Sequence, residues 1–310
     1  MQKPRQTGYY KTSDSHDIYW EIYGREEGLP VICLHGGPGG GRDEYLAEYC
    51  DLNKFQILMF DQRGCGLSKA SNPFLNNTIA YSIQDIQALQ KLAGFGPSII
   101  FGGSWGATLA LEYAKTCPQD CMFLMLYSIF LGRPQDEKWF LYDVKSIVPD
   151  IWEKLVANLD ASELNNIAAA YKQRISSAEK AVWSKATADF LNYMKCLLKF
   201  DLEQGASLKT AGQVTQNDRQ SVLIFLHYST NNYFLDAKGA LKGIEAIRSI
   251  PGKIIHGRHD LDTPLTQAYE LHKAWPASSL QIIPDCGHSD TEPSMKAAIS
   301  KAFAELDKLL

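Results

Sequence analysis

Runs of consecutive apolar residues recur in the first and last parts of the chain, and segments with apolar residues three or four positions apart lie between them. Continuous apolar runs are typical of strands buried on both faces, and the wider spacing is typical of helices that pack on a sheet. The runs that predict strands are 31–34, 55–60, 99–101, 121–129, 253–257 and 280–284. Because strands alternate with helices, the pattern predicts an α/β fold with a mostly parallel, doubly wound sheet.

Two further patterns refine this prediction. Residues 16–23 alternate polar and apolar, which predicts an antiparallel strand with one face toward water. Residues 81–92 carry apolar side chains at helical spacing, and Met295, Ile299, Phe303 and Leu306 do the same near the end of the chain. We therefore expect helices there that pack on the sheet.

The middle of the chain has a different character. From about residue 135 to 240 no convincing strand appears and glycine is nearly absent, while residues 164–175 and 191–198 place apolar side chains on helical faces. This pattern indicates helices inserted between two parts of the sheet. We expect a core formed by 1–134 and 241–310, and a helical cap domain at 135–240.

Composition excludes several classes of partner. The 310 residues are 45% hydrophobic and 21% charged, which is typical of a globular protein, and the net charge of -4 favours neither nucleic acid nor an anionic membrane surface. No apolar run is long enough to cross a membrane, and residues 1–7 lack the apolar core of a signal peptide. The seven scattered cysteines favour reduced thiols in a cytoplasmic protein.

The segment Gly102-Gly103-Ser104-Trp105-Gly106 lies between an apolar strand and a helix. Gly-x-Ser-x-Gly in this context indicates a nucleophile elbow, a sharp turn that presents the serine hydroxyl at the start of the helix. The alternative is a glycine-containing turn with an inactive serine. Ser68, which also follows a glycine-rich turn, lacks a following helix and is a weaker candidate nucleophile.

The loop at 35–41, His-Gly-Gly-Pro-Gly-Gly-Gly, follows the strand 31–34. Its glycines leave backbone N–H groups free to approach a ligand, so a phosphate site is one interpretation, but the Lys-Ser/Thr ending of a P-loop is absent. Its place ahead of the elbow favours an oxyanion hole formed by the backbone N–H groups of Gly37 and Trp105.

A serine nucleophile needs a histidine base and an acid that orients the base. Asp260 follows the strand 253–257, and His288 follows the strand 280–284, in the order that hydrolases with this architecture use. We expect Ser104, Asp260 and His288 to form a catalytic triad that needs no metal or organic cofactor. Asp262 is the alternative acid; His256, within a strand, and His259, on the turn of the acid, are alternative bases.

Several motifs together resemble the prolyl iminopeptidase family of α/β-hydrolases. They are HGGPGG at 35–40, FDQRGCGLS at 60–68, GGSWGA at 102–107, HGRHD at 256–260 and GHS at 287–289. The resemblance implies an α/β-hydrolase fold and an enzyme that releases N-terminal proline from peptides, with Ser104, Asp260 and His288 as its triad. Alternatives are an esterase or amidase acting on small uncharged substrates, and a ligand-binding protein without turnover.

The cap departs from this family in its substrate pocket. The resemblance implies two glutamates that bind the amino group of the substrate, and Thr187 and Thr230 stand at their positions. We therefore expect a pocket without a fixed negative charge, unless Asp189, Glu203 or Asp236 substitutes. Apolar candidates for its wall, which would favour a compact neutral acyl group, are Phe130, Trp139 and Phe140.

Overall fold

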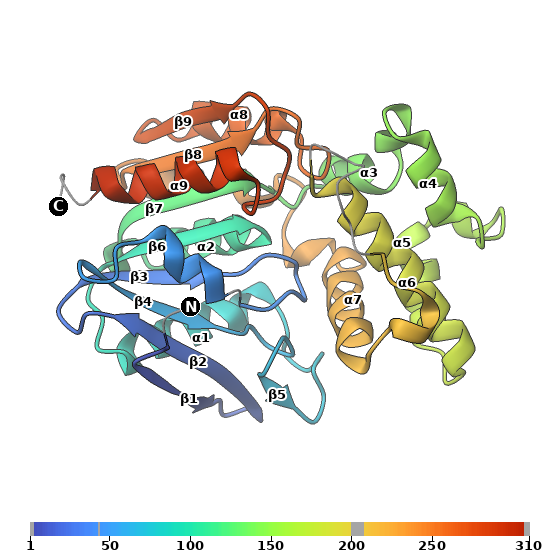
Figure 1. Ribbon diagram of the computed structural model, residues 1–310, viewed down its shortest axis with the longest axis horizontal. Coiled ribbons are helices and arrows are strands. Elements are labelled where there is room, and N and C mark those ends of the chain that lie inside the picture. The colour runs from blue at the N-terminus through green and yellow to red at the C-terminus, as the bar shows by residue number, and fades with distance from the viewer. Residues whose placement is uncertain (1–2, 43, 200–207, 307–310) are drawn as a thin grey trace.

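The computed structural model describes residues 3–42, 44–199 and 208–306, and one nine-stranded sheet runs through it (Figure 1). The strands are β1 Gln6–Lys11, β2 His16–Gly24, β3 Leu29–Leu34, β4 Phe55–Phe60, β5 Lys69–Ala70, β6 Ser98–Ser104, β7 Cys121–Ile129, β8 Gly252–Gly257 and β9 Ser278–Ile283. Their order across the sheet is β1-β2-β4-β3-β6-β7-β8-β9, with the short β5 paired to β2.

From β4 to β9 all neighbouring strands are parallel, as the continuous apolar runs predict. β2 pairs antiparallel with β4 and with β1, which confirms the antiparallel strand expected at 16–23. In the centre of the sheet Val31 of β3 pairs with Ile99 of β6, and both side chains are fully buried. The prediction of an α/β fold with a mostly parallel sheet is confirmed.

Helices cover both faces of the sheet (Figure 1). α1 Ile79–Leu92, α2 Trp105–Thr116 and α8 Leu265–Ala274 contribute to one apolar core. α9 Pro293–Leu306 and the 3-10 helix Glu44–Tyr49 contribute to the core on the other face, where Phe303 packs edge-on against Phe55 and Phe101. Because both faces are covered, the apolar strand runs are buried and the carboxyl ends of the parallel strands are left for a site.

Between β7 and β8 the chain forms α3 Pro134–Leu141, α4 Pro149–Val156, α5 Ile167–Ile175, α6 Lys180–Leu197 and α7 Gln216–Ser229. Figure 1 shows these helices beside one end of the sheet, and we refer to residues 134–241 as the cap segment. Its helices enclose a separate apolar cluster in which Phe190, Leu226 and Ile167 are fully buried. That this segment is a domain of its own stays a prediction.

The helix at 164–175 begins later than its apolar pattern suggests. Asn166 accepts a hydrogen bond from the backbone N–H of Ala169, which starts α5 at Ile167, and Leu164 lies in the preceding 3-10 turn. The other short 3-10 helices are Pro118–Asp120, Asp143–Ser146, Ala211–Gln213, Asn232–Phe234, Gly239–Leu241 and Ile244–Ile247.

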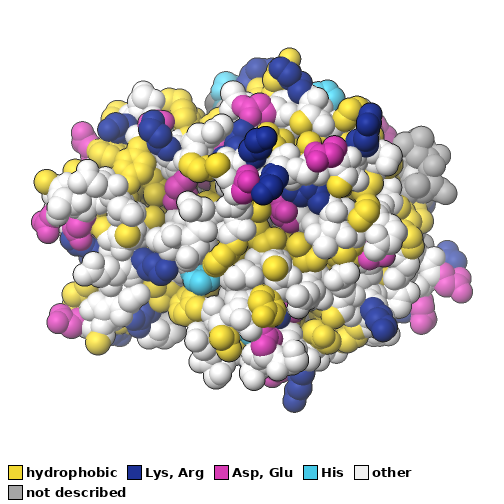
Figure 2. All heavy atoms as spheres, turned by 180° about the vertical axis from the view of Figure 1, so that it is seen from behind, with side chains coloured by type: hydrophobic (Ala, Val, Ile, Leu, Met, Phe, Trp, Pro, Cys, Tyr) yellow, Lys and Arg dark blue, Asp and Glu magenta, His cyan; other side chains and the backbone are white. Residues whose placement is uncertain are grey.

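On the face shown in Figure 2, basic and acidic side chains are interspersed. Among the described residues, no helix combines the length and the apolar character that crossing a bilayer requires.

Candidate active site

Ser104 lies at the junction of β6 and α2 with φ 56° and ψ -124°. A non-glycine residue rarely adopts such a positive φ, so the surrounding packing must hold it there. A Cβ on Gly106 would overlap the carbonyl of Leu34, and a Cβ on Gly103 would overlap the ring of Tyr127. The glycines therefore allow β6 and α2 to approach β3 and β7 closely enough to form this turn.

The glycine-rich loop after β3 passes directly beside this serine. A Cβ built on Gly36 would lie 3.6 Å from the Cβ of Ser104, and Gly37 has φ 124°, a backbone conformation suited to glycine. Gly36, Gly37 and Ser104 all line one cavity. The loop is thus in place to offer backbone groups to a molecule bound at Ser104.

Gln62 holds this loop against the elbow. Its backbone N–H donates to Nε2 of His35 at 2.9 Å, and its side-chain amide donates to the carbonyl of His35 at 2.8 Å. Because Nε2 accepts, Nδ1 of His35 carries the proton and donates to the carbonyl of Gly36 at 2.8 Å. The amide oxygen of Gln62 accepts from the indole N–H of Trp105 at 2.9 Å, so one side chain joins both expected oxyanion segments. The motif at 60–68 contains Gln62, but its role was not foreseen.

Asp260 and His288 lie together at the ends of β8 and β9. Nδ1 of His288 lies 2.9 Å from Oδ2 of Asp260, and Asp260 also accepts hydrogen bonds from the N–H of Thr263 at 2.8 Å and its hydroxyl at 3.0 Å. Asp260 is buried. Burial raises the pKa of this carboxyl, but the positive charge of His288 and these hydrogen bonds outweigh it and leave the pKa below its usual value.

The backbone of His288 is held from two sides. Its carbonyl accepts a hydrogen bond from the hydroxyl of Ser128 at 2.7 Å. Its N–H donates to the carbonyl of Leu198 at 3.0 Å, and the N–H of Ser289 donates to the same carbonyl at 2.8 Å. Leu198 follows the last residue of α6, so the cap segment contributes directly to the position of this histidine.

The residues considered as alternative bases and as an alternative nucleophile lie away from the cavity at Ser104. His256 is fully buried, accepts from the N–H of Ile129 at 2.9 Å and donates to the carbonyl of Thr263 at 2.9 Å, so it supports the turn of Asp260. His259 is exposed. Ser68 is buried, donates to the carbonyl of Asp61 and accepts from the N–H of Tyr19. None of these three faces the cavity at Ser104.

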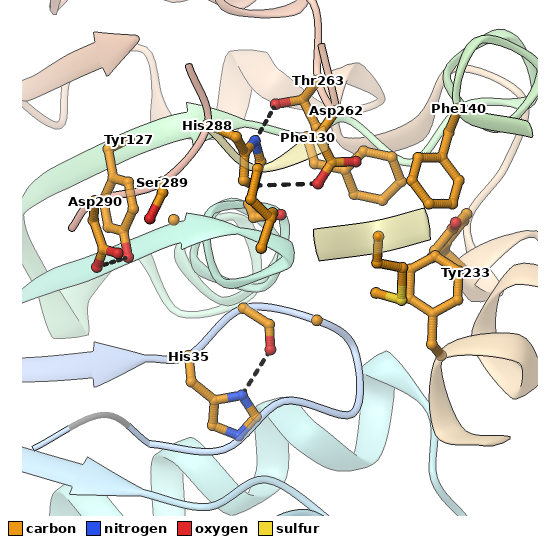
Figure 3. Close-up of a pocket in the computed structure, with 17 residues that line it drawn as sticks. His35, Tyr127, Phe130, Phe140, Tyr233, Asp262, Thr263, His288, Ser289 and Asp290 are labelled. Carbon is orange, nitrogen blue, oxygen red and sulfur yellow. Dashed lines mark hydrogen bonds and ion pairs between the residues drawn. The ribbon is translucent and has the colours of Figure 1, made fainter. Parts of the chain in front are cut away.

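The cavity at Ser104 has a volume of about 300 Å³ (Figure 3). Its wall combines the elbow, the glycine-rich loop, the histidine turn and apolar side chains of the cap segment. The lining residues are His35, Gly36, Gly37, Gly103, Ser104, Tyr127, Phe130, Phe140, Met194, Leu198, Phe225, Tyr233, Asp262, Thr263, His288, Ser289 and Asp290.

Phe130 and Phe140 line this cavity, whereas the other three expected pocket residues do not. The indole N–H of Trp139 donates to the carbonyl of Leu261 at 2.8 Å. Thr187 is fully buried in α6 and donates to the carbonyl of Trp183 at 2.7 Å. Thr230 donates to the carbonyl of Leu226 and accepts from Nζ of Lys172 at 2.8 Å. The expectation that Trp139, Thr187 and Thr230 line the pocket is corrected accordingly.

The expectation of a pocket without negative charge is wrong, because Asp262 and Asp290 both line the cavity. Oδ2 of Asp262 lies 3.5 Å from Nε2 of His288, on the side of the imidazole opposite Asp260, and Figure 3 shows it between His288 and the rings of Phe130 and Phe140. Burial raises the pKa of Asp262 to about 6, although the charge of His288 lowers it. Oδ2 of Asp290 accepts from the hydroxyl of Tyr127 at 3.0 Å.

The carboxylates that could have replaced the two missing glutamates do not line the cavity where the structure describes them. Asp189 pairs with Lys185 and Asp236 pairs with Lys242 at exposed or half-exposed positions, and neither lines the cavity. Glu203 lies outside the described residues.

His288 thus has a carboxylate near each ring nitrogen. Burial lowers its pKa, but the negative charges of Asp260 and Asp262 outweigh burial and raise the pKa to about 9. No hydrogen bond joins Ser104 to His288 within the described residues, although both face the cavity. In the absence of substrate such contacts are often long and shorten when the reaction complex forms. The arrangement is chemically suited to activate a serine hydroxyl.

A parallel sheet with a serine elbow, followed in sequence by an aspartate and a histidine at later strand ends, defines an α/β-hydrolase. Residues 30–292 match the family model described as "alpha/beta hydrolase fold". Proline iminopeptidases from Xylella fastidiosa (strain Temecula1 / ATCC 700964) and Neisseria gonorrhoeae are 36% and 33% identical to the chain, over 94% and 99% of it and 93% and 97% of their own lengths. The chain belongs to the proline iminopeptidase family and is a hydrolase of that type.

Solved structures agree on the fold. A proline iminopeptidase from Mycobacterium smegmatis has a TM-score of 0.63 at 16% identity, covering 98% of this chain and 99% of that one. A putative aryl esterase from Burkholderia cenocepacia has a TM-score of 0.68 at 14% identity, covering 98% of this chain and all of that one. At these identities the likeness shows the α/β-hydrolase fold.

Proposed function

We propose that the protein releases an N-terminal proline, or a similarly small residue, from peptides, with Ser104 as nucleophile, His288 as base and Asp260 as the acid that orients it. The observation that carries this proposal is the Asp260–His288 pair, whose imidazole faces the same cavity as Ser104 on its strained turn. The curated proline iminopeptidases named above support the choice of substrate.

In the first half of the reaction, Oγ of Ser104 attacks the carbonyl carbon of the N-terminal residue while Nε2 of His288 takes the hydroxyl proton. Asp260 holds Nδ1–H and stabilises the imidazolium. The carbonyl oxygen becomes an oxyanion, for which we assign the backbone N–H groups of Trp105 and Gly37. One such donor is typically worth about 10²–10³ in turnover. His288 then gives the proton to the leaving peptide amine, and the C–N bond breaks.

In the second half, water attacks the acyl-enzyme and His288 takes a proton from it. The tetrahedral intermediate collapses, the Ser104–acyl bond breaks, and the proton returns to Oγ of Ser104. The free amino acid leaves and the enzyme is restored. The Asp260–His288 pair and the oxyanion donors serve both halves of the reaction.

The size and surface of the cavity favour a compact acyl group. A volume of about 300 Å³ is at the small end for ligand sites, and Phe130, Phe140 and Phe225 provide apolar surface near Ser104. A pyrrolidine ring has a suitable size and character. The same aromatic wall would also accept a compact neutral acid, so hydrolysis of small uncharged esters or amides is the second candidate function.

We further infer a cytoplasmic location and a substrate that is a short peptide or small molecule, with neither nucleic acid nor a membrane as partner. The seven cysteines are free thiols, and burial raises the pKa of several, Cys33 and Cys65 among them. Free thiols that are this well buried are compatible with a reducing compartment.

The proposal is tested by mass spectrometry of products from short peptides that begin with proline, together with labelling by a fluorophosphonate probe. The expected results are release of free proline and labelling at Ser104. Labelling at another residue, or cleavage at internal bonds only, would contradict the assignment. Rapid hydrolysis of small p-nitrophenyl esters without release of proline would favour the second candidate.

A further inference from the structure

The carboxylate of Asp262 has an unusual environment for a charged group beside a reactive serine. Its side chain is 21% exposed and accepts no hydrogen bond from any described residue; its ionic neighbour is Nε2 of His288 at 3.5 Å. Among the described residues that line the cavity there is no lysine or arginine. The other carboxylate of the cavity, Asp290, is already bonded to the hydroxyl of Tyr127. Asp262 is thus a carboxylate without a hydrogen-bond donor among the described residues, held only by its ion pair with His288, and such a group favours a further cation.

Covalent geometry limits how far an amine of the acyl residue can lie from the base. In an N-terminal residue the amine nitrogen is about 2.5 Å from the carbonyl carbon, because only Cα separates them. The carbonyl carbon approaches the serine oxygen to about 3–3.5 Å before attack, and the base must reach the same oxygen. The amine therefore lies at most about 9 Å from Nε2 of His288, the atom that Asp262 faces, and rotation of the acyl residue can turn it toward that carboxylate.

From this juxtaposition we propose that Asp262 binds the N-terminal ammonium group of the substrate; the inference rests on the proposed aminopeptidase-type reaction. The rings of Phe130 and Phe140, beside Asp262 in Figure 3, would contact the hydrocarbon part of the same residue. Charge recognition and apolar contact would then select an N-terminal residue and exclude internal bonds, which lack an ammonium group.

Other carboxylates near the cavity are less suited to this role. Glu137 on α3 accepts hydrogen bonds from the hydroxyls of Ser229 and Tyr233, and it does not line the cavity. Burial raises its pKa, which favours the neutral form. Asp290 lies on the far side of His288 from Phe140 in Figure 3. Asp262 is the carboxylate that combines access, charge and proximity to the base.

Binding of an ammonium at Asp262 has a second effect. Without substrate, Asp262 stabilises the protonated imidazole and so opposes the action of His288 as a base. A bound ammonium neutralises that carboxylate, which lowers the pKa of His288 and leaves Nε2 for the hydroxyl of Ser104. The amine therefore contributes to kcat as well as to binding, in contrast to an anchor remote from the reaction.

The test compares proline 4-nitroanilide with cyclopentanecarboxylic acid 4-nitroanilide, in which a ring CH₂ replaces the amine. At pH 7 the amine is mostly protonated, since α-amino groups have a pKa of about 7.7–8.0. The wild-type ratio of kcat/KM should favour proline strongly, and Asp262→Asn should reduce this ratio roughly 10- to 100-fold. Asp290→Asn is the matched control and should keep most of the ratio. Asp262→Glu, which restores the charge, should recover part of it.

The pH profile of kcat distinguishes this proposal from a merely structural role of Asp262, because a structural role would leave the profile unchanged. In the wild type the acid limb for the cyclopentane substrate should lie at higher pH than that for the proline substrate, because only the latter neutralises Asp262. In Asp262→Asn the acid limbs for the two substrates should lie at the same pH. Thermal unfolding of each variant verifies that it is folded.

The failures are distinguishable. An enzyme that is labelled at Ser104 and cleaves proline anilide, but keeps its substrate ratio in Asp262→Asn, overturns the inference and leaves the proposed function intact. So does a wild type that shows no preference for the amine, or a loss of preference in Glu137→Gln with none in Asp262→Asn. A protein that cleaves neither substrate and is not labelled overturns both proposals.

Discussion

The indole N–H of Trp105 donates to the side-chain oxygen of Gln62 at 2.9 Å, and this bond links the first residue of α2 to the turn after β4. Gln62 in turn donates to the carbonyl of His35 in the glycine-rich loop. Both donors that we assign to the oxyanion belong to segments that meet at this glutamine. Its amide therefore sets the separation between the two halves of the oxyanion site.

Gln62→Leu removes these two side-chain bonds and leaves two buried polar groups without partners. Each such group typically costs about 1–3 kcal/mol, so we expect the free energy of unfolding to fall by about 2–6 kcal/mol. We also expect kcat to fall more than KM changes, because the oxyanion is bound only during the reaction. Urea unfolding and steady-state kinetics measure the two effects. Gln119→Leu, at an exposed position, is the control and should change neither.

Ser104→Ala and Ser68→Ala should have opposite effects. The hydroxyl of Ser104 makes no hydrogen bond among the described residues, so its removal should abolish hydrolysis and probe labelling while the melting temperature stays nearly constant. The Ser68 hydroxyl bonds to the carbonyl of Asp61 and the N–H of Tyr19, so its loss should lower stability by about 1–2 kcal/mol and leave labelling intact. Labelling that persists in Ser104→Ala would disprove the nucleophile assignment.

The two aspartates beside His288 should be separable by kinetics. Asp260→Asn replaces one of the two carboxylate oxygens by an NH₂ donor and removes the negative charge beside Nδ1, so it should reduce turnover by roughly 10²- to 10⁴-fold. Asp262→Asn, assayed with a neutral substrate, should have a much smaller effect at its optimum. The opposite order would show that Asp262 is the orienting acid. Steady-state kinetics with one p-nitrophenyl ester compare the two variants directly.

The pH dependence follows from the pKa of His288, which is raised to about 9. The base works only when neutral, so kcat/KM for a neutral ester should rise with pH until about 9. Asp262→Asn removes a charge that favours the imidazolium, so this limb should move to lower pH. The raised pKa also stabilises the folded state below the ordinary value of 6.5, and this contribution should be lost as pH rises through about 9. Unfolding at several pH values measures it; a limb unmoved in Asp262→Asn would contradict the coupling.

Replacing the two threonines of the cap segment with glutamate should have unequal effects on the free energy of unfolding. Thr187 is fully buried, so Thr187→Glu would place a charge or a large polar group without a partner and should cost about 3 kcal/mol or more in unfolding free energy. Thr230 is half-buried beside Nζ of Lys172, so Thr230→Glu would gain an ion pair and should be tolerated. Chemical unfolding measures both. Similar stabilities of the two variants would show that the cap packs differently around Thr187.

The strands of this fold were readable from the sequence where burial on both faces produces continuous apolar runs. β3, β4 and β7 therefore lie close to their predicted bounds. β1 was not foreseen, because Gln6–Lys11 is an edge strand with exposed or half-exposed side chains and no apolar run. Its position depends on pairing with β2, which is a tertiary property.

The candidate site likewise has residues that the sequence predicted and residues that it did not. Ser104 ends β6, and Asp260 and His288 follow β8 and β9, so their approach at one edge of the sheet was expected from the topology of a parallel sheet. Their catalytic roles stay a prediction. The position of Asp262 depends on how the turn after β8 directs a side chain, and loop directions have no periodic signal in the sequence. The amide of Gln62 and the carbonyl of Leu198 act through contacts between distant segments, which one sequence does not reveal.

The bonds from His288 and Ser289 to the carbonyl of Leu198 join the proposed base to the end of α6. If α6 lifts away from the sheet to admit a substrate, both bonds break and the histidine turn loses one of its two supports. The hydrolytic machinery is then complete only while α6 is seated above the cavity. We therefore expect a molecule with α6 displaced to be a poor hydrolase, so that reaction at the serine would be confined to the period in which the cap segment covers it.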